Sequence, residues 1–90
     1  MKITYDDTKN ARNIAERGLP FTMVAELDWN QAVIVEDDRR DYGERRLRVL
    51  AFIEDRLYVA VVTFRGNTVH VISFRKANSR EVTQYGNQKA

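Results

Sequence analysis

The stretch from Thr68 to Lys76 holds the residues of this chain that are best suited to bind an anion. It begins with residue types that favour a β-strand, and it contains His70, the only histidine of the chain. It ends in two cations, Arg75 and Lys76, at the point where the strand is expected to lead into a helix. A rigid strand that carries positive charge to one end of a sheet is a good mount for a group such as phosphate.

Arg65, just before the preceding turn, joins Arg75 and Lys76 as a candidate for contact with phosphate and for catalysis. Arg grips phosphate through two parallel hydrogen bonds, and Lys acts as a point charge. Such cations stabilise the charge that develops on a phosphorus centre during cleavage. The alternative is that these residues are solvated charges at the ends of strands.

His70 is a candidate general acid or base, because the pKa of histidine lies near neutrality. The alternative is a half-buried strand histidine that has a hydrogen-bond partner. Strict alternation of side chains places His70 and Arg75 on opposite faces of the strand, unless the strand twists or bulges before Lys76.

A charged segment, Asp37 to Glu44, forms a polar loop that leads into two further cations. Glu44 is a candidate base, Arg45 and Arg46 are candidates for RNA phosphate contact, and Tyr42 is suited to stack on a nucleobase. The alternative is a set of local ion pairs within the segment. Exposed pairs contribute about 0–1 kcal/mol each, so stability alone does not explain the charge density.

The composition restricts the chemistry further. Ninety residues predict a single domain over residues 1–90. One histidine and no cysteine leave no ligand set for a transition metal, and the loop 37–44 lacks the ligand spacing of a calcium loop, so we expect no metal and no cofactor. No apolar run approaches a membrane span or the core of a signal peptide, which predicts a cytoplasmic protein with no membrane partner. The net charge of +2 is too small to indicate nucleic-acid binding by itself.

The apolar periodicity predicts an α+β fold with a four-stranded, mainly antiparallel sheet. The first expected helix runs from Asp7 to Arg17 and carries a narrow apolar stripe of Ala11, Ile14 and Ala15. The second runs from Phe21 to Leu27, with Phe21, Val24 and Leu27 on its buried side. The third runs from Ser79 to about Tyr85, begins with a capping box of Asn78 and Glu81, and is followed by a frayed tail. The expected strands run from Ala32 to Glu36, from Arg45 to Ile53, from Leu57 to Phe64, and from Thr68 to Lys76. The last three strands should form an antiparallel meander.

The third expected strand is apolar on both faces, so it should be central and covered on both sides. Three short helices would leave part of such a sheet exposed, and exposed apolar patches mark interfaces with partners. The alternative is that the first and last helices cover the two faces between them. Tyr85, at the end of the last helix, either stacks on an RNA base or packs at the rim of the core.

A set of landmark residues runs through most of the chain in a fixed order. These residues are Tyr5, Asp6, Lys9, Asn13, Gly18, Phe21 and Ala25; Glu36, Asp37, Arg39, Asp41, Tyr42, Gly43, Glu44 and Arg46; and Thr63, Arg65, Gly66, Val71, Ile72, Ser73, Arg75, Lys76, Ala77, Glu81 and Tyr85. In their order and spacing they resemble the BrnT family of bacterial toxins, the toxin half of a toxin–antitoxin pair. The chain departs from the family at His70, where the family usually has Arg.

The resemblance implies a RelE-like ribonuclease fold, in which helices pack on an antiparallel sheet. It implies an endoribonuclease that cleaves RNA without metal and thereby arrests translation and growth. It also implies a cognate ribbon-helix-helix antitoxin, which blocks the toxin and carries the DNA binding of the complex; a toxin homodimer within that complex is compatible with this. From the residues themselves, a non-catalytic α+β module that binds a protein or RNA remains the alternative.

Overall fold

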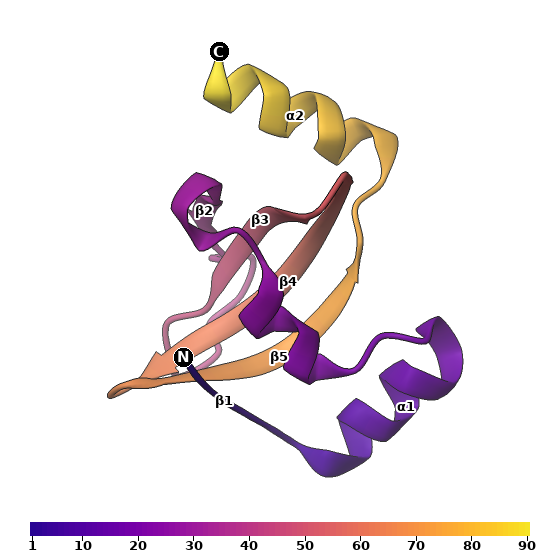
Figure 1. Ribbon diagram of the computed structural model, residues 1–90. Coiled ribbons are helices and arrows are strands. Elements are labelled where there is room, and N and C mark those ends of the chain that lie inside the picture. Colours follow the sequence, from indigo (N-terminus) through magenta and orange to yellow (C-terminus); the bar gives the residue numbers. More distant parts are fainter.

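A computed structural model describes residues 1–90 and shows a five-stranded mixed sheet with helices at both ends of the chain (Figure 1). The elements follow in the order β1 (Lys2–Tyr5), α1 (Asp7–Arg17), η1 (Phe21–Glu26), η2 (Trp29–Gln31), β2 (Val33–Glu36), β3 (Leu47–Ile53), β4 (Arg56–Arg65), β5 (Thr68–Lys76) and α2 (Ser79–Lys89). The strand order in the sheet is β1-β5-β4-β3-β2. The α+β class and the antiparallel meander of β3, β4 and β5 are confirmed.

The prediction of four strands was wrong, because the first residues of the chain form β1. This strand runs parallel to β5, with Ile3 opposite Val69 and Tyr5 opposite Val71. Four residues are too few to show a clear period in sequence, and their partner lies more than sixty positions away. Tertiary pairing therefore decides the conformation here, and the parallel pair makes the sheet mixed.

Helix α1 has the predicted bounds, because both of its caps are encoded locally. The Asp6 carboxylate accepts a hydrogen bond from the backbone N–H of Lys9 at 2.9 Å, which satisfies a free donor of the first turn. At the other end Gly18 adopts the left-handed conformation, with φ 69°, and its N–H donates to the carbonyl of Ile14.

Polar side chains attach α1 to the sheet, since no residue of this helix is buried. The side-chain amide of Asn13 donates to the carbonyls of Leu19 (2.8 Å) and Phe74 (2.9 Å). The side-chain oxygen of Asn10 accepts from the N–H of Phe21. The apolar stripe of α1 therefore faces solvent, and Ile14 keeps 44% of its surface exposed.

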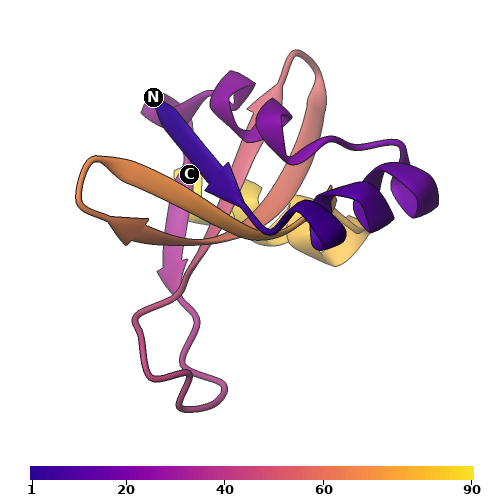
Figure 2. The same ribbon diagram turned by 90° about the horizontal axis from the view of Figure 1, so that it is seen from below.

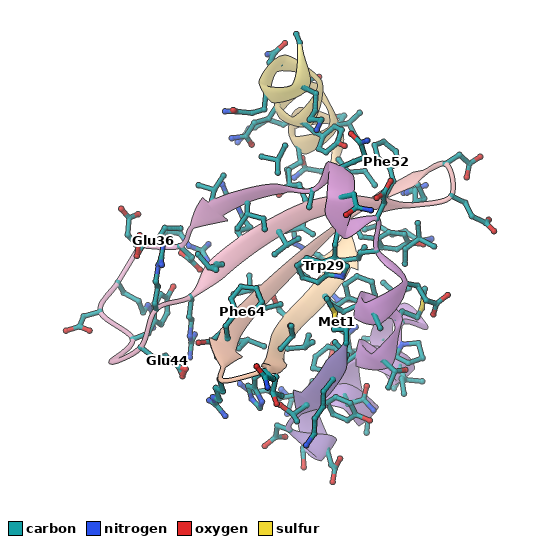
Figure 3. All side chains as sticks on the ribbon, turned by 60° about the vertical axis from the view of Figure 1, so that its left-hand side comes forward. Met1, Trp29, Glu36, Glu44, Phe52 and Phe64 are labelled. Atoms are coloured by element: carbon teal, nitrogen blue, oxygen red, sulfur yellow. The ribbon has the colours of Figure 1, made fainter.

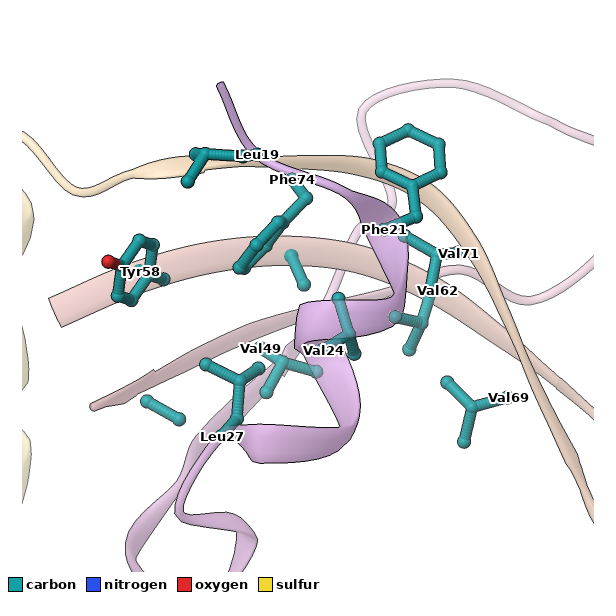
Figure 4. Close-up of a cluster of buried hydrophobic side chains, with 12 residues drawn as sticks. Leu19, Phe21, Val24, Leu27, Val49, Tyr58, Val62, Val69, Val71 and Phe74 are labelled. Carbon is teal, nitrogen blue, oxygen red and sulfur yellow. The ribbon is translucent and has the colours of Figure 1, made fainter. Parts of the chain in front are cut away.

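The segment after Pro20 was predicted to form a second helix from Phe21 to Leu27, but it forms the 3₁₀ helix η1, Phe21–Glu26. The residues expected to be buried there are buried, namely Phe21, Val24 and Leu27. Figure 4 shows these three side chains inserted among those of the sheet. The face of the sheet that they cover is called the core face below.

The opposite face of the sheet is only partly covered. Leu50, Leu57 and Val59 form a small cluster there, against which Tyr85 of α2 packs. Strand β4 contributes to both faces, since Tyr58, Ala60 and Val62 lie in the larger cluster on the core face. Strand β4 is central, as predicted, and it is covered on both sides from Leu57 to Ala60, whereas Val61 is only half-buried on the second face. The remainder of this second face, beyond the cluster under α2, is called the open face.

A β-bulge in β5 overturns the expectation that His70 and Arg75 lie on opposite faces. Val62 pairs with Val71, but Val61 pairs with Ser73, so Ile72 is an extra residue on β5. As a result Val71 and Phe74 both point into the core, although they are three positions apart. His70 and Arg75, which neighbour them, therefore share the open face.

Helix α2 begins as predicted but is longer. Asn78 and Glu81 form the expected capping box, with both hydrogen bonds at 2.9 Å. The helix then continues to Lys89, so the expected frayed tail after Tyr85 was wrong. The Tyr85 hydroxyl donates to the carbonyl of Gln31, and its ring meets Phe52 edge to face. This docking offsets the roughly 1 kcal/mol that a glycine such as Gly86 costs inside a helix.

Candidate functional site

The open face carries polar and cationic side chains from three adjacent strands and from the residue that leads into β3. These side chains belong to Arg46, Arg48, Thr63, His70, Ser73 and Arg75. In the register of the sheet, Val61 lies between Arg48 and Ser73, and Thr63 lies beside His70. The sheet thus holds these groups at fixed positions on rigid strands, which favours a defined binding geometry.

Arg46 and Arg48 are the open-face cations that form no ion pair. Each has a buried Nε that lacks a hydrogen-bond partner. The guanidinium of Arg46 lies over the ring of Tyr42, 4.1 Å from its centroid, which fixes the side chain by a cation–π contact. Buried polar donors nearly always have a partner. Neither guanidinium is neutralised by an ion pair, so both residues are candidates for contact with an anion.

Arg75 is held by Glu81 through two parallel hydrogen bonds of 2.7 and 2.8 Å. The hydrogen bond from Arg75 lowers the pKa of Glu81 to about 2, and the charge of Arg48 contributes to the shift. The same carboxylate also accepts the N–H of Asn78 in the capping box. The start of α2 therefore orients the Arg75 guanidinium, whose side chain remains 38% exposed.

The pair of Glu81 and Arg75 predicts loss of stability in acid. Because the folded-state pKa of Glu81 lies at about 2, below its ordinary 4.5, its contribution is present above pH 4.5 and disappears as the pH falls toward 2. After allowance for screening by solvent, we expect Glu81→Gln to lower the free energy of unfolding at pH 7 by about 2 kcal/mol. Urea denaturation between pH 2 and 7 measures this.

The same titration contains its own control. Glu26 is an exposed carboxylate that takes part in no ion pair. The variant Glu26→Gln should therefore show the same dependence of unfolding free energy on pH as wild type. The curves of wild type and Glu81→Gln should converge near pH 2. Curves that stay parallel over the whole range would show that the ionised carboxylate is not what stabilises the protein.

His70 is half-buried and hydrogen-bonded, as expected for a histidine with only a structural role. It also lies on the open face, among the cations. Its Nδ1 is 2.9 Å from the hydroxyl oxygen of Thr4 in β1. Burial lowers the pKa of His70 below its ordinary 6.5, and the positive charges of Arg65 and Lys9 act in the same direction, against Glu44 and Asp6. The imidazole is therefore mainly neutral at pH 7 and able to accept a proton.

Because His70 is the only histidine, NMR can follow its imidazole without ambiguity. We expect a pKa below 6.5 in the folded protein and a higher value in Arg65→Gln, which removes a nearby positive charge. Since the unfolded chain binds this proton more readily, folding stability should fall as the pH drops below 6.5. A wild-type pKa above 6.5 would contradict the partial burial of the ring beside these positive charges.

The loop 37–44 leaves the sheet as a long excursion (Figure 2) but is anchored at its base. Asp37 is buried, and Arg39 donates to its two carboxylate oxygens at 2.8 and 2.9 Å. This hydrogen bonding from Arg39 lowers the pKa of Asp37 to about 2. The Tyr42 hydroxyl donates to Asp37 at 3.4 Å, so the Asp37 carboxylate helps to position the ring over which Arg46 lies.

Glu44 lies at the rim of the sheet, where the loop rejoins it (Figure 3), and Arg45 and Arg65 lie beside it. Arg65 is 3.3 Å from Glu44, and Arg45 is 3.4 Å from Glu36. These are long, exposed pairs that contribute about 0–1 kcal/mol each and exchange partners easily. All three residues line a hollow of about 450 Å³, which adjoins the open face through Thr63.

Two of the sequence-predicted residues lie away from this arrangement. Lys76 pairs with Tyr58 and lines a hollow with Arg17 and Leu19, on the core side of β5. Tyr85 packs on Phe52 and its hydroxyl donates to the backbone carbonyl of Gln31, so it packs at the rim of the core, the second of the two predictions for it. The structure therefore brings together His70 and Arg75, places Arg65, Arg45 and Glu44 at the rim, and separates Lys76 and Tyr85.

Sequence reasoning did not select Arg48, Thr63 or Ser73. The signal for Arg48 was present, because alternation along β3 puts it on the same side as Arg46, Leu50 and Phe52. A charged residue in an otherwise apolar strand could have marked Arg48 as a candidate site residue. Thr63 gave no such clue; it is buried, and its hydroxyl donates to the carbonyl of Arg45, which secures the end of the loop.

The fold and this face define a small α+β protein that presents arginines on an uncovered sheet, a surface suited to a polyanion. The sequence matches, over residues 5–81, the family described as ribonuclease toxin, BrnT, of type II toxin-antitoxin system. The protein therefore belongs to the BrnT ribonuclease toxins, as the resemblance predicted. Membership makes it the endoribonuclease toxin of a type II pair, with RNA as substrate and a cognate antitoxin as partner.

A comparison with curated proteins finds no match. None of the helices combines the length and apolar character that a membrane span requires. No group of three or more His, Cys, Asp or Glu side chains is arranged to hold a metal ion.

Proposed function

We propose that the open face is the active site, and that the protein cleaves RNA there without a metal ion. The observation that carries this proposal is the grouping of Arg46, Arg48 and Arg75 with a neutral His70 on one uncovered side of the sheet. Metal-free cleavage needs a base for the 2′-hydroxyl and cations for the phosphorus centre. This face offers both within a RelE-like arrangement of helices on a sheet.

In the proposed reaction, His70 accepts the proton of the 2′-hydroxyl. The 2′ oxygen attacks the adjacent phosphorus, the bond from phosphorus to the 5′ oxygen breaks, and solvent supplies the proton that the leaving oxygen gains. Arg48 and Arg75 stabilise the negative charge on the phosphorane, and Arg46 holds the neighbouring phosphate. Tyr42, whose ring lies against the Arg46 guanidinium, stacks on a base. The products are a 2′,3′-cyclic phosphate and a 5′-hydroxyl.

The consequence in the cell, on this proposal, is inhibition of translation and growth. A ribbon-helix-helix antitoxin neutralises the toxin by covering the open face and supplies the DNA binding of the complex, in which two toxin copies can pair. Exposed apolar side chains at the rim of the sheet, such as Phe64 (49% exposed) and Ile34 (47%), offer further contact area. A complex with antitoxin that still cleaves RNA at the full rate would contradict this mode of inhibition.

Expression of the chain alone in a bacterium tests the function. Wild type should slow growth, whereas Arg75→Ala should restore it and Arg65→Ala should restore it in part. Arg56→Ala, which removes an exposed cation at the far end of β4, should remain toxic. If wild type does not slow growth and the purified protein leaves RNA intact, the proposed function fails. If wild type is toxic but both site variants are equally so, only the site assignment fails.

A further inference from the structure

A second group of cations lies beside the open face, on helix α1. Lys9, Arg12 and Arg17 line a groove between this helix and β5, together with Asn13, Glu16, Phe21, Ile72 and Ser73. The groove has a volume of about 200 Å³. Helix α1 lies next to β5 in space (Figure 1), although more than fifty residues separate the two elements in the chain.

These three cations form no ion pair with any carboxylate of the protein. The ion pairs of the protein are made by Arg39, Arg45, Arg65 and Arg75, and none involves Lys9, Arg12 or Arg17. Glu16 also lines the groove, but it pairs with none of the three. The attachment of α1 to the sheet depends instead on the amides of Asn10 and Asn13.

The groove continues directly from the open face. Ser73, exposed at the bulge of β5, lines the groove and lies in the same row of the sheet as Arg48, with Val61 between them. Two strand spacings separate the two residues, which is about 10 Å. At the near end of α1, the charge of Lys9 acts on His70. An extended chain that crosses the sheet from Arg48 to Ser73 would therefore enter the groove.

A second hollow extends this path. It has a volume of about 270 Å³, shares Arg17 with the groove, and is lined by Leu19 and Lys76. Lys9, Arg12, Arg17 and Lys76 thus form a row of cations along the two hollows. Lys76 lies at the end of this row, apart from Arg75. A row of unpaired cations along a shallow groove is the arrangement that follows a nucleic-acid backbone.

We infer that the groove between α1 and β5 binds the sugar–phosphate backbone of single-stranded RNA on one side of the cleaved phosphate. The inference rests on the proposed function and extends it, because it assigns the path of the substrate beyond the active site. The groove is small, about 200 Å³, and its cations contact phosphates without reading base identity. It should contribute affinity that depends strongly on salt and little on sequence.

The test is the binding of a single-stranded oligonucleotide that carries 2′-O-methyl groups and so resists cleavage. Fluorescence anisotropy measures its affinity between about 50 and 200 mM salt for wild type and for the double variant Lys9→Gln, Arg12→Gln. Each lost phosphate contact lowers the salt slope by about 0.7, so two reduce it by about 1.4. Over that range, the affinity of wild type should fall roughly sevenfold more than that of the variant.

The matched control is Arg56→Gln, Lys89→Gln, which removes two exposed cations that do not line the groove. Its salt slope should equal that of wild type, and circular dichroism should show all three proteins folded. If wild type binds and cleaves RNA but the groove variant keeps the full slope, the groove does not hold the backbone. If wild type neither binds nor cleaves RNA, the proposed function itself fails.

Discussion

Replacing Arg48 by alanine should lower the rate of RNA cleavage by roughly 100-fold, the usual effect of removing one preorganised donor from a charged transition state. Arg48 projects from β3 onto the open face, its Nε lacks a partner, and it forms no ion pair. Glu81, on which its charge also acts, is held by Arg75. Its loss therefore removes positive charge from the site without releasing a buried anion. Single-turnover cleavage of a short RNA at saturating enzyme measures the effect.

Two further variants define the role of Arg48. Arg48→Lys keeps the charge but loses the planar set of donors, so its rate should lie between those of wild type and Arg48→Ala. Arg56→Ala removes an exposed arginine at the far end of β4 and should cleave as wild type does. A rate for Arg48→Ala equal to that of Arg56→Ala would remove Arg48 from the site.

Replacing Phe74 by alanine should have the largest effect on stability, a loss of about 3–5 kcal/mol in the free energy of unfolding. Phe74 is only 1% exposed, and its ring stacks on Tyr58 with centroids 5.2 Å apart. The total stability of such domains is roughly 5–15 kcal/mol, so much of the population could unfold. Because the bulge directs this ring inward, the loss would also disturb the neighbouring Arg75.

Phe64 provides the matched control within the same hairpin. It is 49% exposed, so Phe64→Ala should cost less than about 1 kcal/mol. Urea denaturation of the two variants at pH 7 compares them directly. Equal losses in both would mean that the bulge does not place Phe74 in the core as described.

Locally encoded features of the fold could be predicted from the sequence. Helix α1 has its predicted bounds because Asp6 and Gly18 cap it within its own segment. Strand β5 has its predicted bounds for a similar reason: a turn precedes it and the capping box at Asn78 follows it. The buried side of η1 was also correct, because burial depends on the apolar pattern and not on the type of helix.

Features that depend on distant pairing could not be predicted. The bulge at Ile72 arises from the register between β4 and β5, and it decides that His70 and Arg75 share a face. The pairing of β1 beside β5 supplies the hydroxyl of Thr4 to His70. The sequence therefore identified individual candidates for the site, but it could not show which of them lie together or that Arg75 is held by Glu81.

The most direct test of the central claim is cleavage of a defined single-stranded RNA by the purified protein in the presence of excess EDTA. We expect the wild-type protein to cleave at the same rate with and without EDTA and to give products that end in a 2′,3′-cyclic phosphate. A position that carries 2′-deoxyribose should not be cleaved. Protein carrying Arg48→Ala should be roughly 100-fold slower under the same conditions. Activity that disappears with EDTA, or that persists at the 2′-deoxy position, would contradict metal-free cleavage on the open face.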